Sequence, residues 1–330
     1  MQYRTLSSSD LSVSVISFGA WAIGGSMWGG TDDEAAIRAI RASLDLGVTC
    51  VDTAAIYGMG HSECVVGKAI AGRRDGVVVA TKCGLRWDLE DGAFFFEGQT
   101  PEGEPRRIFR NLRPDSIRHE CEQSLKRLGV DVIDLYQCHW PDPTSNLDDT
   151  MDALLDLQRQ GKIRAIGVSN FTPDMMRQCL AKGVLASDQP KYNLIEREIE
   201  PEILPFCREH NIGILAYSPM AMGLLTGKMG PDHTFNGDDT RRNRPWFSVQ
   251  NRQRVRDMLA KIKPIADDHG VTFGQLTLNW VISQPGLTTA LAGARNEKQA
   301  AENLKAADFT LSESELATMR RCAEELGAPV

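Results

Sequence analysis

The sequence lacks a C-x-x-C pair, a run of eighteen apolar residues, and a basic segment followed by an apolar stretch at its N-terminus. Its eight cysteines stand apart from one another, so we expect reduced thiols rather than a disulfide framework. Because no stretch is long enough to cross a bilayer and no signal peptide is recognisable, we expect a cytoplasmic protein without a membrane partner.

The sequence has fewer basic than acidic residues: 37 lysines and arginines against 44 aspartates and glutamates, for a net charge of −7. This balance argues against nucleic acid as the main partner, but it leaves room for a local basic pocket that binds a phosphate. Hydrophobic residues make up 42% and charged residues 25% of the 330 residues, as in ordinary globular proteins. We expect a single domain over residues 1–330, with a core that needs neither disulfides nor metals.

Short β-branched runs alternate with longer amphipathic stretches along the whole chain. The alternation predicts parallel β–α units, and eight strands favour an α/β fold of the closed (β/α)8 TIM-barrel type over a doubly wound sheet, the alternative. The expected strands are Val15–Phe18, Val48–Asp52, Val77–Lys82, Ile133–His139, Ile163–Ser169, Ala186–Gln189, Ile212–Ser218 and Thr288–Ala292. The expected helices are Asp32–Leu46, Arg113–Leu128, Leu147–Gln160, Pro173–Ala181, Glu196–His210, Val249–His269, Phe273–Ser283, Glu297–Leu304 and Glu313–Glu325. A hairpin of Tyr3–Leu6 with Val13–Ile16 is expected before the barrel.

Two long segments, Gly84–Leu112 and Met220–Phe247, break this rhythm and are expected to be irregular loops after the third and seventh strands. Loops of this length are uncommon unless they are functional. In a barrel both would lie on the C-terminal face, where active sites are built. The first contains the aromatic run Phe94–Phe96, and the second a basic run at 241–244 that we interpret as a solvated charge cluster.

Ionisable residues close three of the expected strands: Asp52 ends VTCVD, Lys82 ends VVVATK and His139 ends IDLYQCH. Tyr57 follows Asp52 after a short turn. Each residue alone is as easily structural as functional. Because the C-terminal ends of barrel strands converge on one mouth, however, the four side chains are expected to meet.

Such a group suits proton transfer to a carbonyl oxygen. A phenol titrates near pH ~10, and a nearby ammonium is expected to lower its pKa while a carboxylate compensates the ammonium. An imidazole can orient the carbonyl. Tyr57 would then protonate the oxygen of an aldehyde or ketone as hydride arrives at carbon, and would take the proton from an alcohol in the reverse direction.

Seven segments along the chain are similar to blocks of the aldo-keto reductase family, in that family's order. They are VDTAAIYGMGHSE, VATKCG, LYQCHWPDP, GKIRAIGVSNF, QPKYNLIER, ILAYSPMAMGLLTGK and ALAGARNEKQAAENL. The resemblance runs from about Phe18 to Asn303 and is closest to the bacterial inositol-operon-associated and general-stress branch. It implies an NAD(P)(H)-dependent oxidoreductase without a metal, and it places the family's catalytic tetrad on Asp52, Tyr57, Lys82 and His139.

The resemblance also implies where a cofactor lies. Amide and hydroxyl side chains would bind the nicotinamide carboxamide, Tyr217 would stack on its ring, the segment from Ser218 would wrap the pyrophosphate, and the last helix of the matched region would hold the adenosine. The residues concerned are Ser169, Asn170, Gln189, Tyr217, Ser218, Pro219, Leu225, Gly227, Lys228, Gly293, Arg295, Gln299, Glu302 and Asn303.

Arg295 bears on the choice between the two nicotinamide cofactors. A guanidinium beside a helix N-terminus suits an anion such as the adenosine 2′-phosphate, so we expect NADP(H) to be preferred over NAD(H). The alternative is that Arg295 simply pairs with Glu297 or Glu302.

Other motifs are incomplete. GLLTGK is one residue short of a P-loop, no G-x-G-x-x-G follows the first strand, and His119-Glu-Cys-Glu-Gln lacks the second histidine of a zinc motif. Trp21, Trp28 and Trp140 are the expected substrate contacts. The competing functions are a cofactor-sensing regulatory subunit and a Schiff-base aldolase that uses Lys82 as its nucleophile. The sequence leaves the physiological substrate and the oligomeric state open.

Overall fold

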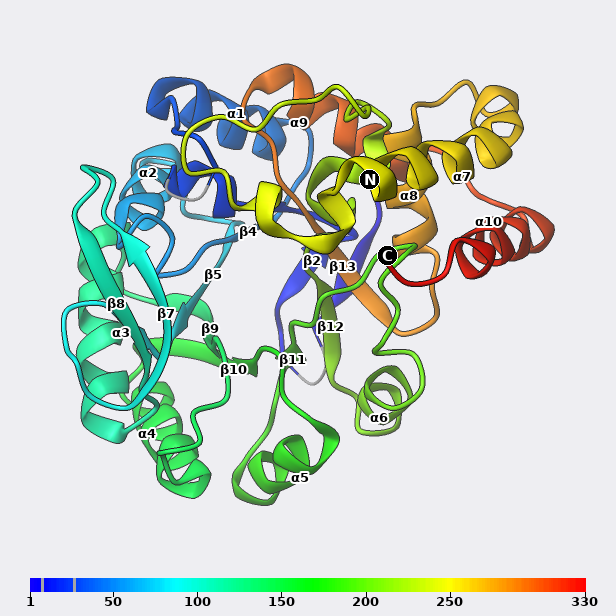
Figure 1. Ribbon diagram of the computed structural model, residues 1–330. Coiled ribbons are helices and arrows are strands. Elements are labelled where there is room, and N and C mark those ends of the chain that lie inside the picture. The colour runs from blue at the N-terminus through cyan, green and yellow to red at the C-terminus, as the bar shows by residue number, and fades with distance from the viewer. Residues whose placement is uncertain (7–8, 26–27) are drawn as a thin grey trace.

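The computed structural model describes residues 1–6, 9–25 and 28–330, and a closed barrel of eight parallel strands forms its centre (Figure 1). Around the barrel the strands follow the order β10-β11-β12-β13-β3-β4-β5-β9. In chain order they are β3 (Ile16–Gly19), β4 (Cys50–Asp52), β5 (Val78–Cys83), β9 (Ile133–Cys138), β10 (Ile163–Val168), β11 (Ser187–Asp188), β12 (Gly213–Ala216) and β13 (Leu287–Ala292). The predicted (β/α)8 barrel is confirmed, and the doubly wound alternative is wrong.

Helices surround the barrel (Figure 1). They are α1 (Asp33–Asp45), α2 (His61–Ile70), α3 (Pro114–Leu128), α4 (Leu147–Arg159), α5 (Pro173–Lys182), α6 (Ile203–Glu209), α7 (Val249–Asp268), α8 (Phe273–Ile282), α9 (Glu297–Leu304) and α10 (Glu313–Leu326). Helices α7 and α10 pack against each other outside the regular β–α repeat. None of the helices in the described ranges is both long and apolar enough to cross a membrane.

Two helices differ from the sequence prediction. Helix α2 was not predicted, because it begins after Gly60 in the left-handed conformation (φ +98°) and has no side-chain cap that would announce it. The predicted helix Glu196–His210 is shorter in the structure, where only α6 is helical. The N–H groups of Ile195 and Glu196 donate to Asn193 Oδ1, which holds the start of the predicted helix in a turn.

The segment 84–112, expected to be irregular, forms a three-stranded antiparallel sheet beside the barrel mouth, drawn in cyan in Figure 1. Its strands are β6 (Leu85–Arg86), β7 (Ala93–Gln99) and β8 (Pro105–Arg110), with β8 in the centre. The pairing of β7 with β8 shifts register between Phe94 and Phe96, so that Phe95 lies at a bulge. The second long segment is largely irregular, as expected, and contains three short 3-10 turns, η2 (Ala221–Thr226), η3 (Thr240–Asn243) and η4 (Pro245–Phe247).

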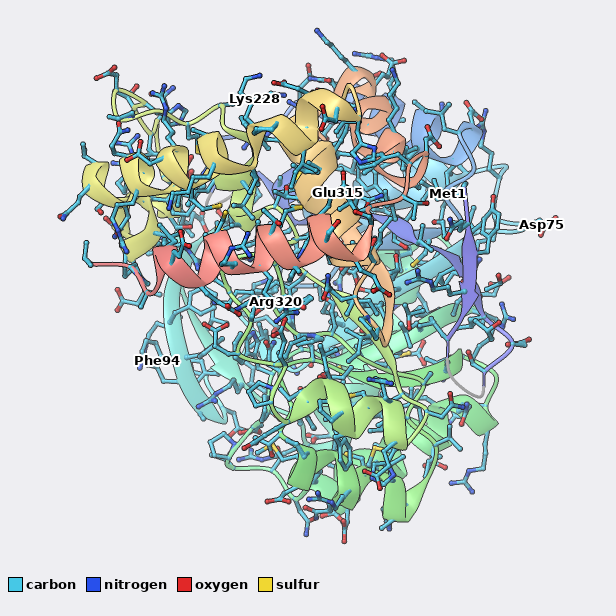
Figure 2. The ribbon with its side chains drawn as sticks, turned by 90° about the vertical axis from the view of Figure 1, so that its right-hand side faces the viewer. Met1, Asp75, Phe94, Lys228, Glu315 and Arg320 are labelled. Carbon is cyan, nitrogen blue, oxygen red and sulfur yellow. The ribbon has the colours of Figure 1, made fainter. Side chains whose placement is uncertain are left out.

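The expected hairpin is confirmed: β1 (Tyr3–Thr5) pairs with β2 (Ser12–Ser14) in antiparallel fashion. Leu6, Leu11 and Val13 from this hairpin pack on the apolar side chains inside the barrel, among them Leu135 and Leu215. The hairpin thus closes the N-terminal end of the barrel. Figure 2 shows Met1, beside the hairpin, and Phe94 of β7 at opposite ends of the molecule.

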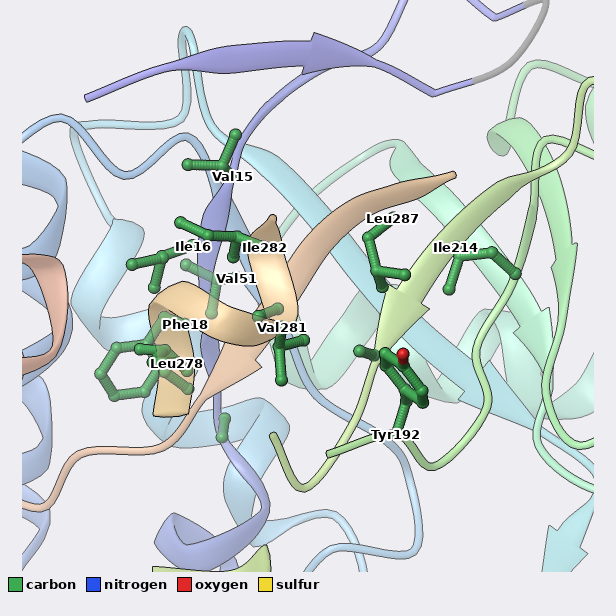
Figure 3. Packing of buried hydrophobic residues seen from close by; sticks show 14 of the residues in the cluster. Val15, Ile16, Phe18, Val51, Tyr192, Ile214, Leu278, Val281, Ile282 and Leu287 are labelled. Carbon is green, nitrogen blue, oxygen red and sulfur yellow. The ribbon is translucent and has the colours of Figure 1, made fainter. Parts of the chain in front are cut away.

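The main hydrophobic core lies between the barrel strands and the helices. Figure 3 shows part of it, with Ile16 and Phe18 from β3 and Leu278 and Val281 from α8. Because the strands are apolar on both faces, their outward residues fill this core and their inward residues fill the barrel. The charged pair Asp52–Lys82 lies at the C-terminal end of the barrel interior, and Ser17 and Thr289 form a hydrogen-bonded pair deeper inside.

One buried carboxyl group in β11 predicts how stability depends on pH. Asp188 is fully buried, and neither of its carboxyl oxygens has a hydrogen-bond partner of normal geometry among the described residues. Burial raises its pKa to about 8, whereas the unfolded chain titrates near ~3.9. Between these values the folded protein binds more protons than the unfolded chain, so this group makes the free energy of unfolding decrease as pH rises from about 4 to 8.

Replacing Asp188 by asparagine removes that dependence. Relative to the wild type, Asp188→Asn is expected to gain roughly 3 kcal/mol in the free energy of unfolding between pH 5 and pH 8. Urea denaturation at both pH values measures the difference. A stability difference between the two proteins that is the same at pH 5 and pH 8 would contradict the prediction.

Candidate active site

A buried ion pair lies at the C-terminal end of the barrel. Lys82 at the end of β5 donates to Asp52 Oδ2 at the end of β4, with 2.7 Å between Nζ and oxygen. The two side chains are 0% and 4% exposed. Lys82 Nζ also donates to the Thr53 carbonyl at 2.8 Å and to Tyr57 Oη at 3.4 Å, so three acceptors surround the ammonium group.

Tyr57 stands on the turn that follows β4. Its ring lies 5.0 Å from Lys82 Nζ and 5.6 Å from the His139 ring, to which it is nearly perpendicular. The turn is held by close contact between two glycine backbones: a Cβ on Gly58, which has φ +61°, would lie 2.2 Å from the Gly24 carbonyl oxygen. Since Gly24 belongs to the turn η1 (Trp21–Gly24), this contact also brings Trp21 within 6.2 Å of the Tyr57 ring.

The surroundings set the protonation of these groups. Burial, reinforced by the Asp52 charge, raises the pKa of Tyr57 well above its ordinary value. Burial and then the Lys82 charge lower the pKa of His139 far below its ordinary value. Burial also lowers the pKa of Lys82, while the Asp52 carboxylate opposes this. Tyr57 and His139 are thus neutral at pH 7. The net pKa of Tyr57 lies above its ordinary value and not below it as expected, because desolvation of the phenolate outweighs the stabilisation by the nearby Lys82 cation.

Next to the ion pair, a chain of amides and hydroxyls crosses the mouth of the barrel. Gln189 Nε2 donates to Asp52 Oδ1 at 2.8 Å, and its backbone carbonyl accepts from Ser169 Oγ at 2.6 Å. Asn170, at φ +62°, donates to Ser169 Oγ and accepts from the Tyr217 hydroxyl at 3.1 Å. These four side chains are the ones expected at the nicotinamide, and the structure brings them together.

A cavity of about 380 Å³ runs from Tyr57 toward α9. Most of the expected site residues line it: Trp21, Trp28, Asp52, Tyr57, Gln189, Tyr217, Ser218, Pro219, Lys228, Gly293, Arg295, Gln299, Glu302 and Asn303. Lys82, His139, Ser169 and Asn170 lie just behind this lining, in contact with it.

Three expected site residues are placed differently. Leu225 is fully buried in the hydrophobic core, so its side chain does not face the cavity, and Gly227 lies outside the cavity lining. Trp140 lies outside the cavity lining and packs on Phe95, with 5.4 Å between the ring centroids. The β7 bulge turns Phe95 toward Trp140, as bulges commonly redirect a side chain.

Within the segment 220–247, Arg241 lines the cavity, whereas Arg242 and Arg244 are exposed to solvent. The Arg241 side chain is only 15% exposed and forms a salt bridge with Asp239. Its guanidinium group also stacks on Trp28, 5.0 Å from the ring centroid. The interpretation of the basic run as a solvated cluster is therefore wrong for Arg241. Asp238 of the same loop accepts from the Gly29 N–H at 3.0 Å, which ties the loop to the segment after η1.

Arg295 does not pair with either of the two glutamates considered from sequence. It donates to the Trp28 carbonyl at 2.6 Å, whereas Glu302 pairs with Lys228 at 3.2 Å and Glu297 with Arg38 at 3.5 Å. Its guanidinium, like that of Arg241, therefore faces the cavity. Lys228 and Arg295 line the cavity near α9, and Arg241 lines it beside Trp28.

Comparison with known proteins identifies the family. A model of the aldo/keto reductase family matches residues 15–324. The chain is 41% identical over 302 residues to "Aldo-keto reductase YhdN" of Bacillus subtilis (strain 168), covering 91% of this chain and 86% of that protein. It is 38% identical over 332 residues to "NADH-specific methylglyoxal reductase" of Escherichia coli (strain K12), covering 99% of each.

A solved structure agrees with these relatives. The glycerol dehydrogenase AKR11B4 from Gluconobacter oxydans matches with a TM-score of 0.86 and 40% identity, covering 97% of this chain and 95% of that chain. The chain therefore belongs to the aldo/keto reductase family, a family of oxidoreductases, as its motifs predicted.

Proposed function

We propose that this chain transfers hydride reversibly between a nicotinamide cofactor and a small aldehyde, ketone, polyol or sugar. The observation that supports this most directly is the neutral Tyr57 hydroxyl, 3.4 Å from the Lys82 ammonium group at the mouth of the barrel. A proton donor beside a fixed cation suits a step in which a carbonyl oxygen gains negative charge. The relatives named for methylglyoxal and glycerol act on small oxygenated compounds, in line with this class of substrate.

The residues along the cavity fit such a cofactor. Ser169, Asn170 and Gln189 offer amide and hydroxyl groups to a carboxamide, and Tyr217 offers an aromatic face. The cations at the other end suit phosphate groups. When bound, the nicotinamide ring would supply or accept the hydride at the substrate carbon.

In this mechanism Tyr57 is the general acid and base. During reduction its hydroxyl donates the proton to the carbonyl oxygen, and the Lys82 ammonium stabilises the phenolate that is left. The neutral His139 imidazole donates a hydrogen bond that orients the same oxygen. Asp52 holds Lys82 charged and in place. Trp21 and Trp28, which line the cavity, would contact the substrate from the side of the mouth.

An assay of cofactor oxidation tests the proposal. Purified protein with NADPH or NADH and a panel of small aldehydes, ketones and keto-sugars is expected to lose the nicotinamide absorbance, and NADP+ with glycerol or other polyols to gain it. Absence of turnover with every carbonyl and every alcohol would reject the proposal. Tight cofactor binding without turnover would favour the regulatory-subunit alternative.

The aldolase alternative is disfavoured by the surroundings of Lys82. A Schiff-base lysine must lose its proton and attack a carbonyl carbon. Here three oxygen acceptors lie within 3.4 Å of Nζ, and one is a buried carboxylate. This arrangement stabilises the ammonium form and leaves no open direction of attack. Borohydride trapping of a substrate adduct on Lys82 would overturn that conclusion.

We further propose that NADP(H) is preferred over NAD(H), with Arg295 binding the 2′-phosphate. The Arg295 guanidinium, which lines the far end of the cavity, supports this, although one relative is named as NADH-specific. Arg295→Leu is expected to lower kcat/KM for NADPH about tenfold or more and to change that for NADH much less. The exposed Arg38, which pairs with Glu297 near α9, is a matched control as Arg38→Leu. A wild type that uses NADH better than NADPH would refute the preference.

A further inference from the structure

Gln137, a residue that sequence reasoning passed over, lies under the candidate site. It is on β9, two residues before His139, and is fully buried inside the barrel. Its Nε2 donates to Asp52 Oδ1 at 3.3 Å, and its Oε1 accepts from Gln189 Nε2 at 3.3 Å. The space it occupies is made by Gly167, where a Cβ would lie 2.9 Å from Gln137 Cγ.

These contacts leave only one orientation for the Gln189 amide. Its Nε2 donates both hydrogens inward, one to Asp52 Oδ1 and one to Gln137 Oε1. A flipped amide would set the Gln189 carbonyl oxygen against the carboxylate and against the Gln137 carbonyl oxygen, which is repulsive in a buried site. Gln189 therefore turns its own carbonyl oxygen to the cavity, where an amide N–H donor is the matching ligand group.

We propose that Gln137 is a positioning residue that acts through two partners. Through Gln189 it fixes the acceptor offered to the nicotinamide carboxamide, and through Asp52 it completes the hydrogen bonding of the carboxylate that holds Lys82. The inference rests on the proposed hydride transfer, and it assigns a role to a residue that touches neither cofactor nor substrate. It also links binding of the cofactor to the charge of the ion pair, because both depend on the same buried amide.

The Asp52 contact has an electrostatic consequence. Asp52 already raises the pKa of Tyr57. With one donor fewer, the carboxylate charge is less compensated and raises that pKa further. The other ionisable groups around Asp52, Lys82 and Tyr57 stay unchanged when only residue 137 is altered; they are Cys50, Glu63, His139 and Tyr217. A shift of the Tyr57 pKa would therefore report the Asp52 contact.

The experiment compares Gln137→Met with Gln137→Glu. Methionine keeps the length and removes both hydrogen bonds. We expect kcat to decrease about tenfold, the Kd for the cofactor to increase several-fold, and the pH midpoint of alcohol oxidation, which needs the Tyr57 phenolate, to move upward. The Kd is measured by quenching of protein fluorescence, so it does not depend on turnover.

The Gln137→Glu variant is expected to keep both hydrogen bonds of Gln137, and thus the activity, only at a pH where the new carboxyl group is protonated. When protonated, the new carboxyl group can donate to Asp52 Oδ1 and accept from Gln189 Nε2, as the Gln137 amide does. Once ionised it repels Asp52. The activity of Gln137→Glu relative to wild type is thus expected to be near one at pH 6 and to decrease about tenfold toward pH 9, whereas that of Gln137→Met is low at both.

Thr289→Val is the matched control. Thr289 is also fully buried inside the barrel, where its hydroxyl is 2.7 Å from Ser17 Oγ, away from the ion pair. It is expected to lower the melting temperature without moving the pH midpoint or the cofactor Kd. If Gln137→Met behaves in the same way, Gln137 is merely structural and the inference is overturned. If the wild type shows no turnover but binds the cofactor, the proposed function fails, and an equal Kd for Gln137→Met then overturns this inference separately.

Discussion

Replacing Tyr57 by phenylalanine is expected to lower kcat about a thousandfold while the Kd for the cofactor changes little. The variant removes one oxygen atom, which under the proposed function is the proton donor for the carbonyl, and general acid–base catalysis contributes ~10²–10⁴-fold. The ring is retained, so its contacts with Trp21 and His139 persist. Single-turnover measurements with prebound cofactor would separate the chemical step from binding.

A matched variant tests the assignment of the proton to Tyr57. Tyr217 also faces the cavity, and its hydroxyl donates to Asn170 at 3.1 Å. Tyr217→Phe keeps the stacking face and is expected to reduce kcat far less than Tyr57→Phe. Equal losses in the two variants, or a Tyr57→Phe enzyme with near-normal turnover, would show that another group transfers the proton.

Replacing Lys82 by methionine is expected to lower both turnover and stability. The change leaves the Asp52 carboxylate buried without its cation, and breaking a buried ion pair in this way costs about 3 to 5 kcal/mol. Turnover should decrease about a hundredfold or more, because the cation beside the Tyr57 oxygen is also lost. Urea denaturation and steady-state kinetics measure the two effects.

The double variant Asp52→Asn with Lys82→Met distinguishes the two effects. Removing both charges eliminates the uncompensated carboxylate, so the double variant should recover most of the stability lost in Lys82→Met. Activity should not recover, since the ammonium group is still missing. Recovery of both, or of neither, would contradict the account of this ion pair given above.

The fold and the clustering of Asp52, Tyr57, Lys82 and His139 could be predicted from the sequence for a common reason. Each barrel strand is a short apolar run, and its last residue faces the mouth, so Asp52, Lys82 and His139 are conspicuous as polar residues that end such runs. The order of the surrounding blocks then identified the family. Gln137 lies inside one of these runs, where nothing in the pattern IDLYQCH separates an inward polar residue from an ordinary buried one.

Contacts between distant segments could not be predicted in this way. The partner of Arg241 is Trp28, more than two hundred residues away in the chain, and Arg295 binds the Trp28 carbonyl across a similar span. Helix α2 has no capping residue, and the bulge at Phe95 breaks the alternation that would have indicated β7. In each case the local sequence is neutral, and tertiary packing decides the structure.

The hairpin that closes the N-terminal end of the barrel limits the route by which a proton can reach Tyr57. Below the ion pair and the Ser17–Thr289 hydrogen bond, the interior is filled by apolar side chains, with Leu6, Leu11 and Val13 at the N-terminal end of the barrel. Such a layer conducts neither water nor hydronium, so under the proposed function the proton that Tyr57 donates in each cycle would have to be replaced from the C-terminal mouth of the barrel. Solvent and substrate would then enter through the same opening, and Tyr57 would be reprotonated only after the product alcohol has left.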